Sequence, residues 1–145
     1  MAKVHFFYST MNAGKSTALL QSAHNYHETG NETILFIPRE DADKNLGLIK
    51  SRIGLSASAV VIDSKLKIYN YVKKELSQRK VDAILVDEAQ FLKKDHVLQM
   101  CKVCDELQIP VMCYGIRTDF RGELFEGSAS LLALADNLIE QKTVC

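Results

Sequence analysis

The chain has 145 residues, of which 47% are hydrophobic and 25% are charged, and it contains only seven glycines and two prolines. This composition is typical of an ordinary folded domain and excludes a disordered or fibrous chain. Eighteen basic and eighteen acidic residues give a formal net charge of zero. Because a long nucleic acid is held largely by neutralising its phosphates, we expect no large nucleic-acid partner. A small anion needs only a nest of N–H groups and one lysine, so it stays possible.

The first residues run directly into a strand-like segment that carries the polar residues His5 and Ser9. That segment is too short and too polar for a signal peptide or a membrane span. The cysteines are too few and too poorly spaced for a disulfide framework. They are Cys101, Cys104, Cys113 and Cys145. We therefore expect free thiols, a cytoplasmic location and no membrane attachment, and we expect core packing rather than metal binding for the pair Cys101 and Cys104.

Short β-branched runs alternate with longer helical stretches along the whole chain. This alternation predicts one α/β domain over residues 1–145, with a mostly parallel central sheet and helices on both faces. We expect strands at 3–9, 32–37, 59–62, 81–87 and 110–116, and a last strand within 138–145. We expect helices at 15–29, 64–79, 94–107 and 127–135.

Local signals refine three of these elements. Gly30 is the expected end of the first helix, and Ser64 is the expected N-cap of the second. The third helix is expected to pack one stripe of residues inward, namely Val97, Cys101, Cys104 and Leu107. Residues 38–58 are polar with no clear period, which predicts a long loop that is functional or mobile.

The sharpest local motif is Ser9-Thr10-Met11-Asn12-Ala13-Gly14-Lys15-Ser16, between the first expected strand and the first expected helix. It matches the phosphate-loop pattern G-x-x-x-x-G-K-[ST], except that Ser9 replaces the first glycine. Gly14 lets the backbone approach the phosphates, Lys15 reaches the β and γ phosphates, and the Ser16 hydroxyl can bind magnesium. The strand before and the helix after it disfavour a chance AGKS string. The expected ATP contacts here are Ser9, Met11, Asn12, Ala13, Gly14, Lys15, Ser16 and Thr17.

A second motif is the apolar run 83–86 that ends in Asp87 and Glu88. Both carboxylates then lie at the carboxyl edge of a parallel strand, where α/β proteins bind ligands. We expect Asp87 to hold magnesium and contact the nucleotide, and Glu88 to orient or deprotonate the attacking nucleophile. Taken alone, the pair also fits a strand that merely ends in a polar turn.

Three strings, YSTMNAGKST, VDEAQF and CYGIRTDFRGELFEGS, together resemble the bacterial thymidine kinases of the zinc-containing (type II) family. The resemblance covers essentially the whole chain. It implies a RecA-like domain, assembled as a homotetramer, that transfers the γ-phosphate of ATP to the 5′-hydroxyl of thymidine. It also implies that Glu88 is the general base, that Phe120 stacks on the thymine ring and that Met11 lies near its methyl group. Further implied contacts are Ile116 and Phe125 to thymidine and Gln90 to the nucleotide.

The sequence departs from this family pattern at two places. Where the family has an acid, any residue and then arginine, this chain has Asp41-Ala42-Asp43 and so lacks the arginine. The candidate substitutes are Arg39, Arg52, Arg117 and Arg121. The family also continues into a zinc ribbon and a lasso loop over thymidine, which we expect to be absent after Cys145. Cys145 aligns with the first zinc ligand, so we expect an incomplete zinc site there.

Three functions fit these motifs. The first is a thymidine kinase that uses ATP and magnesium. The second is a catalytically weak ATP-binding module or subunit of the same fold, favoured by the two departures. The third is a RecA-like ATPase that acts on nucleic acid, which the neutral charge disfavours.

Overall fold

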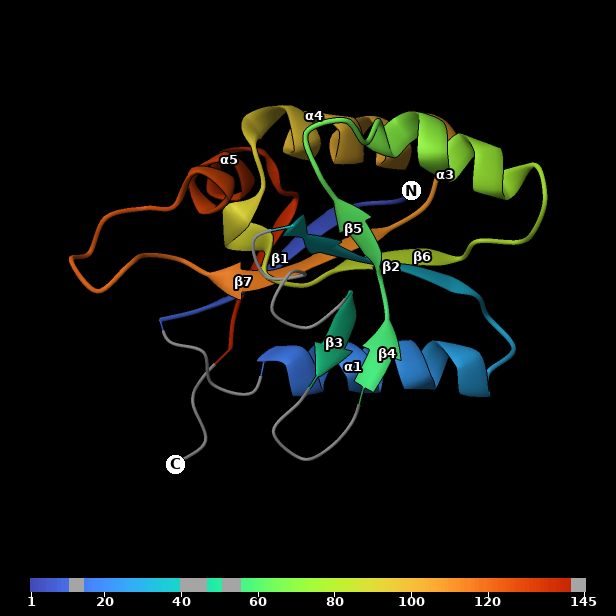
Figure 1. Cartoon of the computed structure of the whole chain (residues 1–145), viewed down its shortest axis with the longest axis horizontal. Coiled ribbons are helices and arrows are strands. Elements are labelled where there is room, and N and C mark those ends of the chain that lie inside the picture. The colour runs from blue at the N-terminus through green and yellow to red at the C-terminus, as the bar shows by residue number, and fades with distance from the viewer. Residues whose placement is uncertain (11–14, 40–46, 51–55, 142–145) are drawn as a thin grey trace.

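The computed structural model describes residues 1–10, 15–39, 47–50 and 56–141. Six strands form a parallel central sheet in the order β5-β2-β6-β7-β1-β8 (Figure 1). The strands are β1 (Val4–Ser9), β2 (Thr33–Pro38), β5 (Val60–Ile62), β6 (Ala83–Val86), β7 (Val111–Ile116) and β8 (Asn137–Glu140). The predicted α/β fold and its predicted sheet strands are confirmed, although the last strand ends at Glu140, and residues 142–145 of its predicted range lie outside the described residues.

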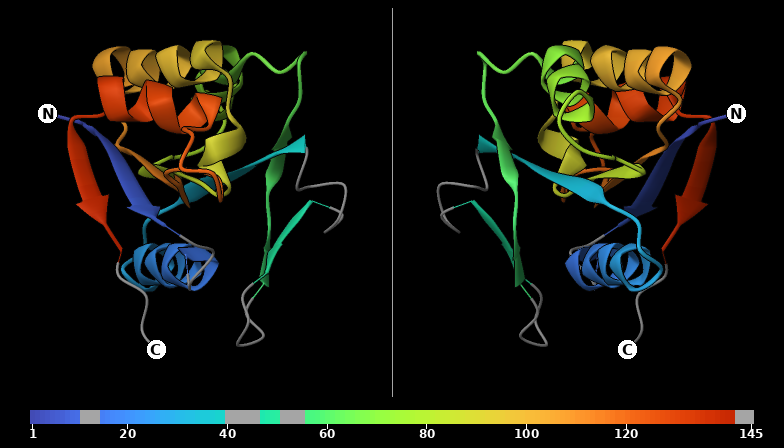
Figure 2. Two further views of the ribbon diagram at one scale, coloured as in Figure 1. Left: turned by 90° about the vertical axis from the view of Figure 1, so that its left-hand side faces the viewer. Right: turned by 90° about the vertical axis from the view of Figure 1, so that its right-hand side faces the viewer.

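Helices cover both faces of this sheet (Figures 1 and 2). On one face lies α1 (Lys15–Glu28), and on the other lie α3 (Ile68–Leu76), α4 (Lys94–Lys102) and α5 (Glu126–Leu134). Alternate residues of a strand point to opposite faces. In β6, Ile84 and Val86 therefore pack with the three-helix layer, while Ala83 and Leu85 pack with α1. Coverage on both faces explains why β6 is apolar throughout.

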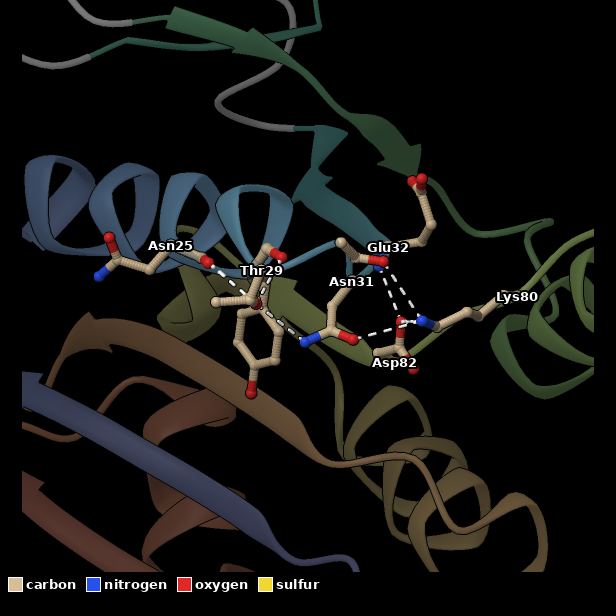
Figure 3. Close-up of polar contacts among 8 residues, drawn as sticks. Asn25, Thr29, Asn31, Glu32, Lys80 and Asp82 are labelled. Atoms are coloured by element: carbon tan, nitrogen blue, oxygen red, sulfur yellow. Dashed lines mark hydrogen bonds and ion pairs between the residues drawn. The ribbon is translucent and has the colours of Figure 1, made fainter.

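The end of α1 is tied to the start of β6 by a polar network (Figure 3). Gly30, the predicted stop of this helix, has a φ of 81°, which favours glycine. The Lys80 ammonium donates to the Gly30 carbonyl at 3.2 Å and to Asn31 Oδ1 at 3.3 Å. It also pairs with Asp82 at 3.3 Å, and Asp82 accepts the Glu32 N–H at 2.8 Å. These contacts hold the starts of β2 and β6 side by side, so their carboxyl ends reach the same edge.

The predicted N-cap of the second helix is wrong. This helix, α3, begins at Ile68, and the preceding residues form a turn. Asp63 Oδ1 accepts the N–H groups of Lys65 and Leu66, each at 2.9 Å. An acidic side chain that captures nearby amides favours a local turn over helix. Ser64 therefore lies inside that turn, before the helix starts.

The inward stripe predicted for the third helix is only partly correct. The α-helix α4 ends at Lys102, and the chain continues as a π-helix, η2 (Val103–Leu107). A π-helix adds a residue to the turn, so later side chains rotate away from the α-helical stripe. Cys101 and Leu107 are half-buried. The fully buried residues of this segment are Val97, Met100, Val103 and Cys104.

The loop predicted over 38–58 is wrong at two short segments. β3 (Leu48–Lys50) and β4 (Ser56–Ser58) form a small antiparallel sheet beside α1 (Figure 1). Ile49 is buried in the same cluster as the α1 residue Leu19. Strands of three residues are too short to show a period in the sequence.

Three cysteines are free thiols, as predicted: Cys101, Cys104 and Cys113. Burial raises the pKa of the Cys104 thiol to about 12, and it also raises the pKa of Cys113. The folded protein therefore retains thiol protons that the unfolded chain releases above pH ~8.5. We expect this part of the folding stability to be complete below that pH and to be lost as the pH rises toward the folded value.

The thiol prediction is tested by measuring Tm between pH 8 and pH 11. Cys104→Ala should lower Tm at pH 8 but make its fall with pH shallower than in the unaltered chain. Val103→Ala is the matched control, because it also removes core volume but leaves the thiols unchanged. Parallel Tm curves for Cys104→Ala and the unaltered chain would contradict the raised thiol pKa.

Candidate functional site

Two sequence motifs meet at the carboxyl edge of the sheet. The strands β6, β7 and β1 are neighbours, so the residues that follow them gather at that edge. β1 ends at Ser9, which is 1% exposed and lies opposite Ile116 of β7. In the first turn of α1, the Ser16 hydroxyl donates a hydrogen bond of 2.8 Å to Asp87 Oδ2. The first turn of α1 and the residue that follows β6 are therefore in direct contact, and their joint role in binding a nucleotide stays a prediction.

Asp87 is 2% exposed, and its carboxylate is used on both sides. Its Oδ2 accepts from Ser16, while its Oδ1 accepts the Glu88 N–H at 2.9 Å. A buried carboxylate costs energy unless hydrogen bonds compensate it. This pair presents hydroxyl and carboxylate oxygens, which are the donors that magnesium prefers, so the residues fit that ion.

Glu88 has a left-handed backbone, with φ of 50° and ψ of 42°. Such a conformation is uncommon for a residue other than glycine and is often found at functional sites. Its carboxylate accepts a hydrogen bond from Gln90 Nε2. Glu88 is half-buried and directly follows Asp87 in the chain.

Gln90 belongs to a single 3-10 turn, η1 (Ala89–Phe91), and is 2% exposed. Its Oε1 accepts the Ile116 N–H at 3.2 Å. Its amide therefore lies between Glu88 and the end of β7. The sequence placed Gln90 among the nucleotide contacts, and the structure gives its side chain these two protein partners.

The loop after β7 carries Phe120 at its tip. Thr118 and Leu124 form an antiparallel bridge across this loop. Asp119 Oδ1 accepts the Arg121 N–H at 2.8 Å, which closes the turn. Phe120 is 97% exposed, with the Arg121 guanidinium 5.7 Å from its ring centroid. The ring that was predicted to stack on thymine is therefore exposed on the surface of the chain.

A second aromatic residue near the site was missed by the sequence interpretation. Phe91 packs edge-to-face against Phe125, with 5.7 Å between the ring centroids. Phe91 also lines a cavity of about 380 Å³, together with Arg39, Lys93 and His96. The string VDEAQF contains Phe91, so its position next to the acidic pair was the available signal.

Several expected site residues lie outside the described residues. These are Met11, Asn12, Ala13, Gly14 and Cys145. Lys15 and Thr17 lie in the first turn of α1. In the described part of the chain, no three or more His, Cys, Asp and Glu side chains gather in a way that could hold a metal ion. In the same part, no helix is long and apolar enough to span a membrane.

The candidate substitutes for the missing arginine lie in different places. Arg117 is 5.8 Å from the Tyr8 ring centroid. Arg121 pairs with Asp119 at 3.0 Å and with Glu123 at 3.5 Å, in the exposed loop. Arg39 lines the cavity beside Phe91. Arg52 and the string 41–43 lie outside the described residues.

A strand, phosphate loop and helix joined through Ser16 to an acidic strand define a P-loop nucleotide-binding fold. The family model described as thymidine kinase matches residues 2–145, and the chain belongs to this family. Its 145 residues are 50% identical to a thymidine kinase of Zymomonas mobilis, of which they cover 75%. They are 51% identical to thymidine kinases of Photorhabdus laumondii and Haemophilus influenzae, covering 72% and 75% of those proteins.

Proposed function

We propose that the chain transfers the γ-phosphoryl group of ATP to the 5′-hydroxyl of thymidine, giving thymidine monophosphate and ADP. The hydrogen bond between Ser16 and Asp87, beside Glu88, is the observation that carries this proposal. It joins a phosphate-binding element to an acid at one sheet edge, in a chain whose relatives are thymidine kinases.

ATP is bound on the β1 side of this edge. The phosphate loop from Ser9 to Ser16 supplies N–H groups and the helix N-terminus for the phosphates, and Lys15 contributes a cation. Ser16 and Asp87 would hold magnesium, which neutralises charge on the β and γ phosphates when bound. These roles need no large positive surface, in agreement with a net charge of zero.

Glu88 acts as the general base in this proposal. Its carboxylate takes the proton of the 5′-hydroxyl as that oxygen bonds to the γ-phosphorus. The bond from the γ-phosphorus to the bridging oxygen breaks, and ADP leaves with that oxygen. A positioned base of this type contributes about 10² to 10⁴ in rate.

Thymidine is held on the β7 side of the same edge. The proposed contacts are Met11, Ile116, Phe120 and Phe125, and the packing of Phe91 on Phe125 adds Phe91 to them. Aromatic faces bind any base, so selection of thymine requires a close apolar contact to its methyl group and hydrogen bonds to its edge. A homotetramer and an incomplete zinc site at Cys145 stay predictions from the family resemblance, and a cytoplasmic location stays a prediction from the sequence.

Product analysis tests the proposed reaction. After incubation with ATP and magnesium, mass spectrometry should show one added phosphoryl group on thymidine. The matched control is 5′-deoxythymidine, which lacks the acceptor hydroxyl and should gain none. Phosphorylation of both nucleosides, or of neither, would contradict transfer to the 5′-hydroxyl.

Ser16→Ala tests the proposed magnesium site. Hydrogen bonds to charged groups contribute about 1.5–3 kcal/mol, so the concentration of magnesium that gives half-maximal turnover should rise about tenfold or more. Ser22→Ala is the control, because Ser22 lies on the same helix but hydrogen-bonds to Tyr114 at 3.1 Å instead. An unchanged magnesium titration for Ser16→Ala would remove Ser16 from the site.

A further inference from the structure

The amide of Gln90 joins two parts of the site that lie on different strands. Its Nε2 donates to the Glu88 carboxylate, and its Oε1 accepts the Ile116 N–H at 3.2 Å. The side chain is 2% exposed, so water does not replace these partners easily. One buried amide therefore connects Glu88, after β6, to the last residue of β7.

The backbone of β7 leaves the Gln90 side chain little room to move. A Cβ added to Gly115 would lie 2.8 Å from Gln90 Oε1 and 3.0 Å from the backbone nitrogen of Gln90. Real Cβ atoms do not approach that closely, so the absence of a side chain at Gly115 permits this packing. The strand thus confines the amide on the side away from Glu88.

The first turn of α5 packs against both η1 and the end of β7. A Cβ added to Gly127 would lie 2.3 Å from the Ala89 carbonyl oxygen, so α5 packs directly on the backbone of η1. Ser128 Oγ donates to the Ile116 carbonyl. The turn that carries Gln90 and the strand end that it contacts are both fixed by one helix.

We propose that Gln90 is a positioning residue that holds the Glu88 carboxylate and ties its place to the end of β7. The loop with Phe120 leaves from that strand end, so the base and the proposed nucleoside side share one support. This inference rests on the proposed role of Glu88 as the base. A displacement of about 1 Å at a reacting group costs on the order of 10²-fold in rate, so Gln90 should affect turnover more than ATP binding.

Two substitutions separate the contacts of Gln90. Gln90→Leu removes both hydrogen bonds at similar volume. Gln90→Glu keeps an acceptor for the Ile116 N–H but replaces the donor that faces Glu88. We expect each to lower kcat about 10- to 100-fold, with the ATP dissociation constant within about twofold of the unaltered chain.

Gln99→Leu is the matched control. Gln99 also donates to a carboxylate, that of Asp95 at 2.7 Å, and accepts a backbone N–H, that of Tyr69 at 3.1 Å. Gln99 lies on α4 and does not contact Glu88 through either hydrogen bond, so Gln99→Leu should leave kcat unchanged. If Gln90→Leu is unfolded at the assay temperature by thermal scan, Gln90→Glu carries the test.

A double-mutant cycle decides whether Gln90 acts through Glu88. In a Glu88→Gln background, Gln90→Leu should lower kcat no further, because the base is already missing. If the fold-reductions in kcat of Gln90→Leu and Glu88→Gln multiply in the double variant, Gln90 does not act through Glu88 and the positioning role is overturned. Unchanged turnover in both Gln90 variants while Glu88→Gln is slow would overturn it as well. If Glu88→Gln alone keeps full turnover, the assignment of Glu88 as the base in the proposed function is wrong. Gln90 would then have no catalytic base to position.

Discussion

Glu88→Gln should lower kcat for thymidine phosphorylation by about 10² to 10⁴, with little change in ATP affinity. The substitution keeps the size of the side chain and removes its ability to accept the hydroxyl proton. ATP affinity should persist because the proposed phosphate contacts belong to the loop from Ser9 to Ser16 and to Asp87. Lys15→Ala makes the contrast, since it removes a proposed phosphate contact and should weaken ATP binding itself.

Glu106→Gln is the matched control for this experiment. Glu106 is exposed, precedes β7 at the opposite edge of the sheet, and accepts a hydrogen bond from the Tyr69 hydroxyl at 3.1 Å. Its kcat should equal that of the unaltered chain. Single-turnover measurements with each variant separate the chemical step from product release. An unchanged chemical step in Glu88→Gln would show that another group accepts the proton.

Among the variants proposed here, Gly127→Ala should lower the free energy of unfolding most. The added Cβ would lie 2.3 Å from the Ala89 carbonyl oxygen and 2.9 Å from the Gln90 carbonyl oxygen, which are both backbone atoms. Backbone cannot yield as a flexible side chain can, so we expect a loss of about 1–3 kcal/mol or more. For a domain of this size, each kcal/mol lowers Tm by about 2–4 °C.

The control for Gly127→Ala is Ala129→Ser, a change at an exposed position of the same helix. Surface substitutions of this kind change stability by about 0.5 kcal/mol or less. Because η1 carries Gln90, Gly127→Ala should also slow turnover at temperatures where it stays folded. A Tm equal to that of the unaltered chain would contradict the close contact between α5 and η1.

The parts of this fold that the sequence predicted are those set by local pattern. The run 83–86 is apolar because β6 is covered on both faces, and this continuous apolar run and its acidic end are visible in the sequence. The sequence also placed Ser16 and Asp87 near each other, as two expected magnesium ligands from motifs that follow β1 and β6. The order of the motifs along the chain was sufficient to predict both features.

The parts that the sequence did not predict depend on partners far away in the chain. Gln90 is fixed by Ile116 and by the missing side chain at Gly115, and no local pattern shows either contact. Phe91 faces Phe125 only because α5 packs on η1. The helix α3 begins later than predicted because Asp63 accepts hydrogen bonds from nearby backbone amides. Helix periodicity in the sequence does not reveal this competition.

Steady-state ADP release, measured with and without thymidine in the presence of ATP and magnesium, tests most directly whether this sheet edge is a thymidine kinase site. We expect little ADP without thymidine, a saturable rise when thymidine is added, and loss of that rise in Glu88→Gln. ADP release at the same rate with and without thymidine would instead indicate an ATPase. Calorimetric binding of ATP with no ADP release in either condition would indicate an ATP-binding module, and either result would contradict the proposed phosphoryl transfer.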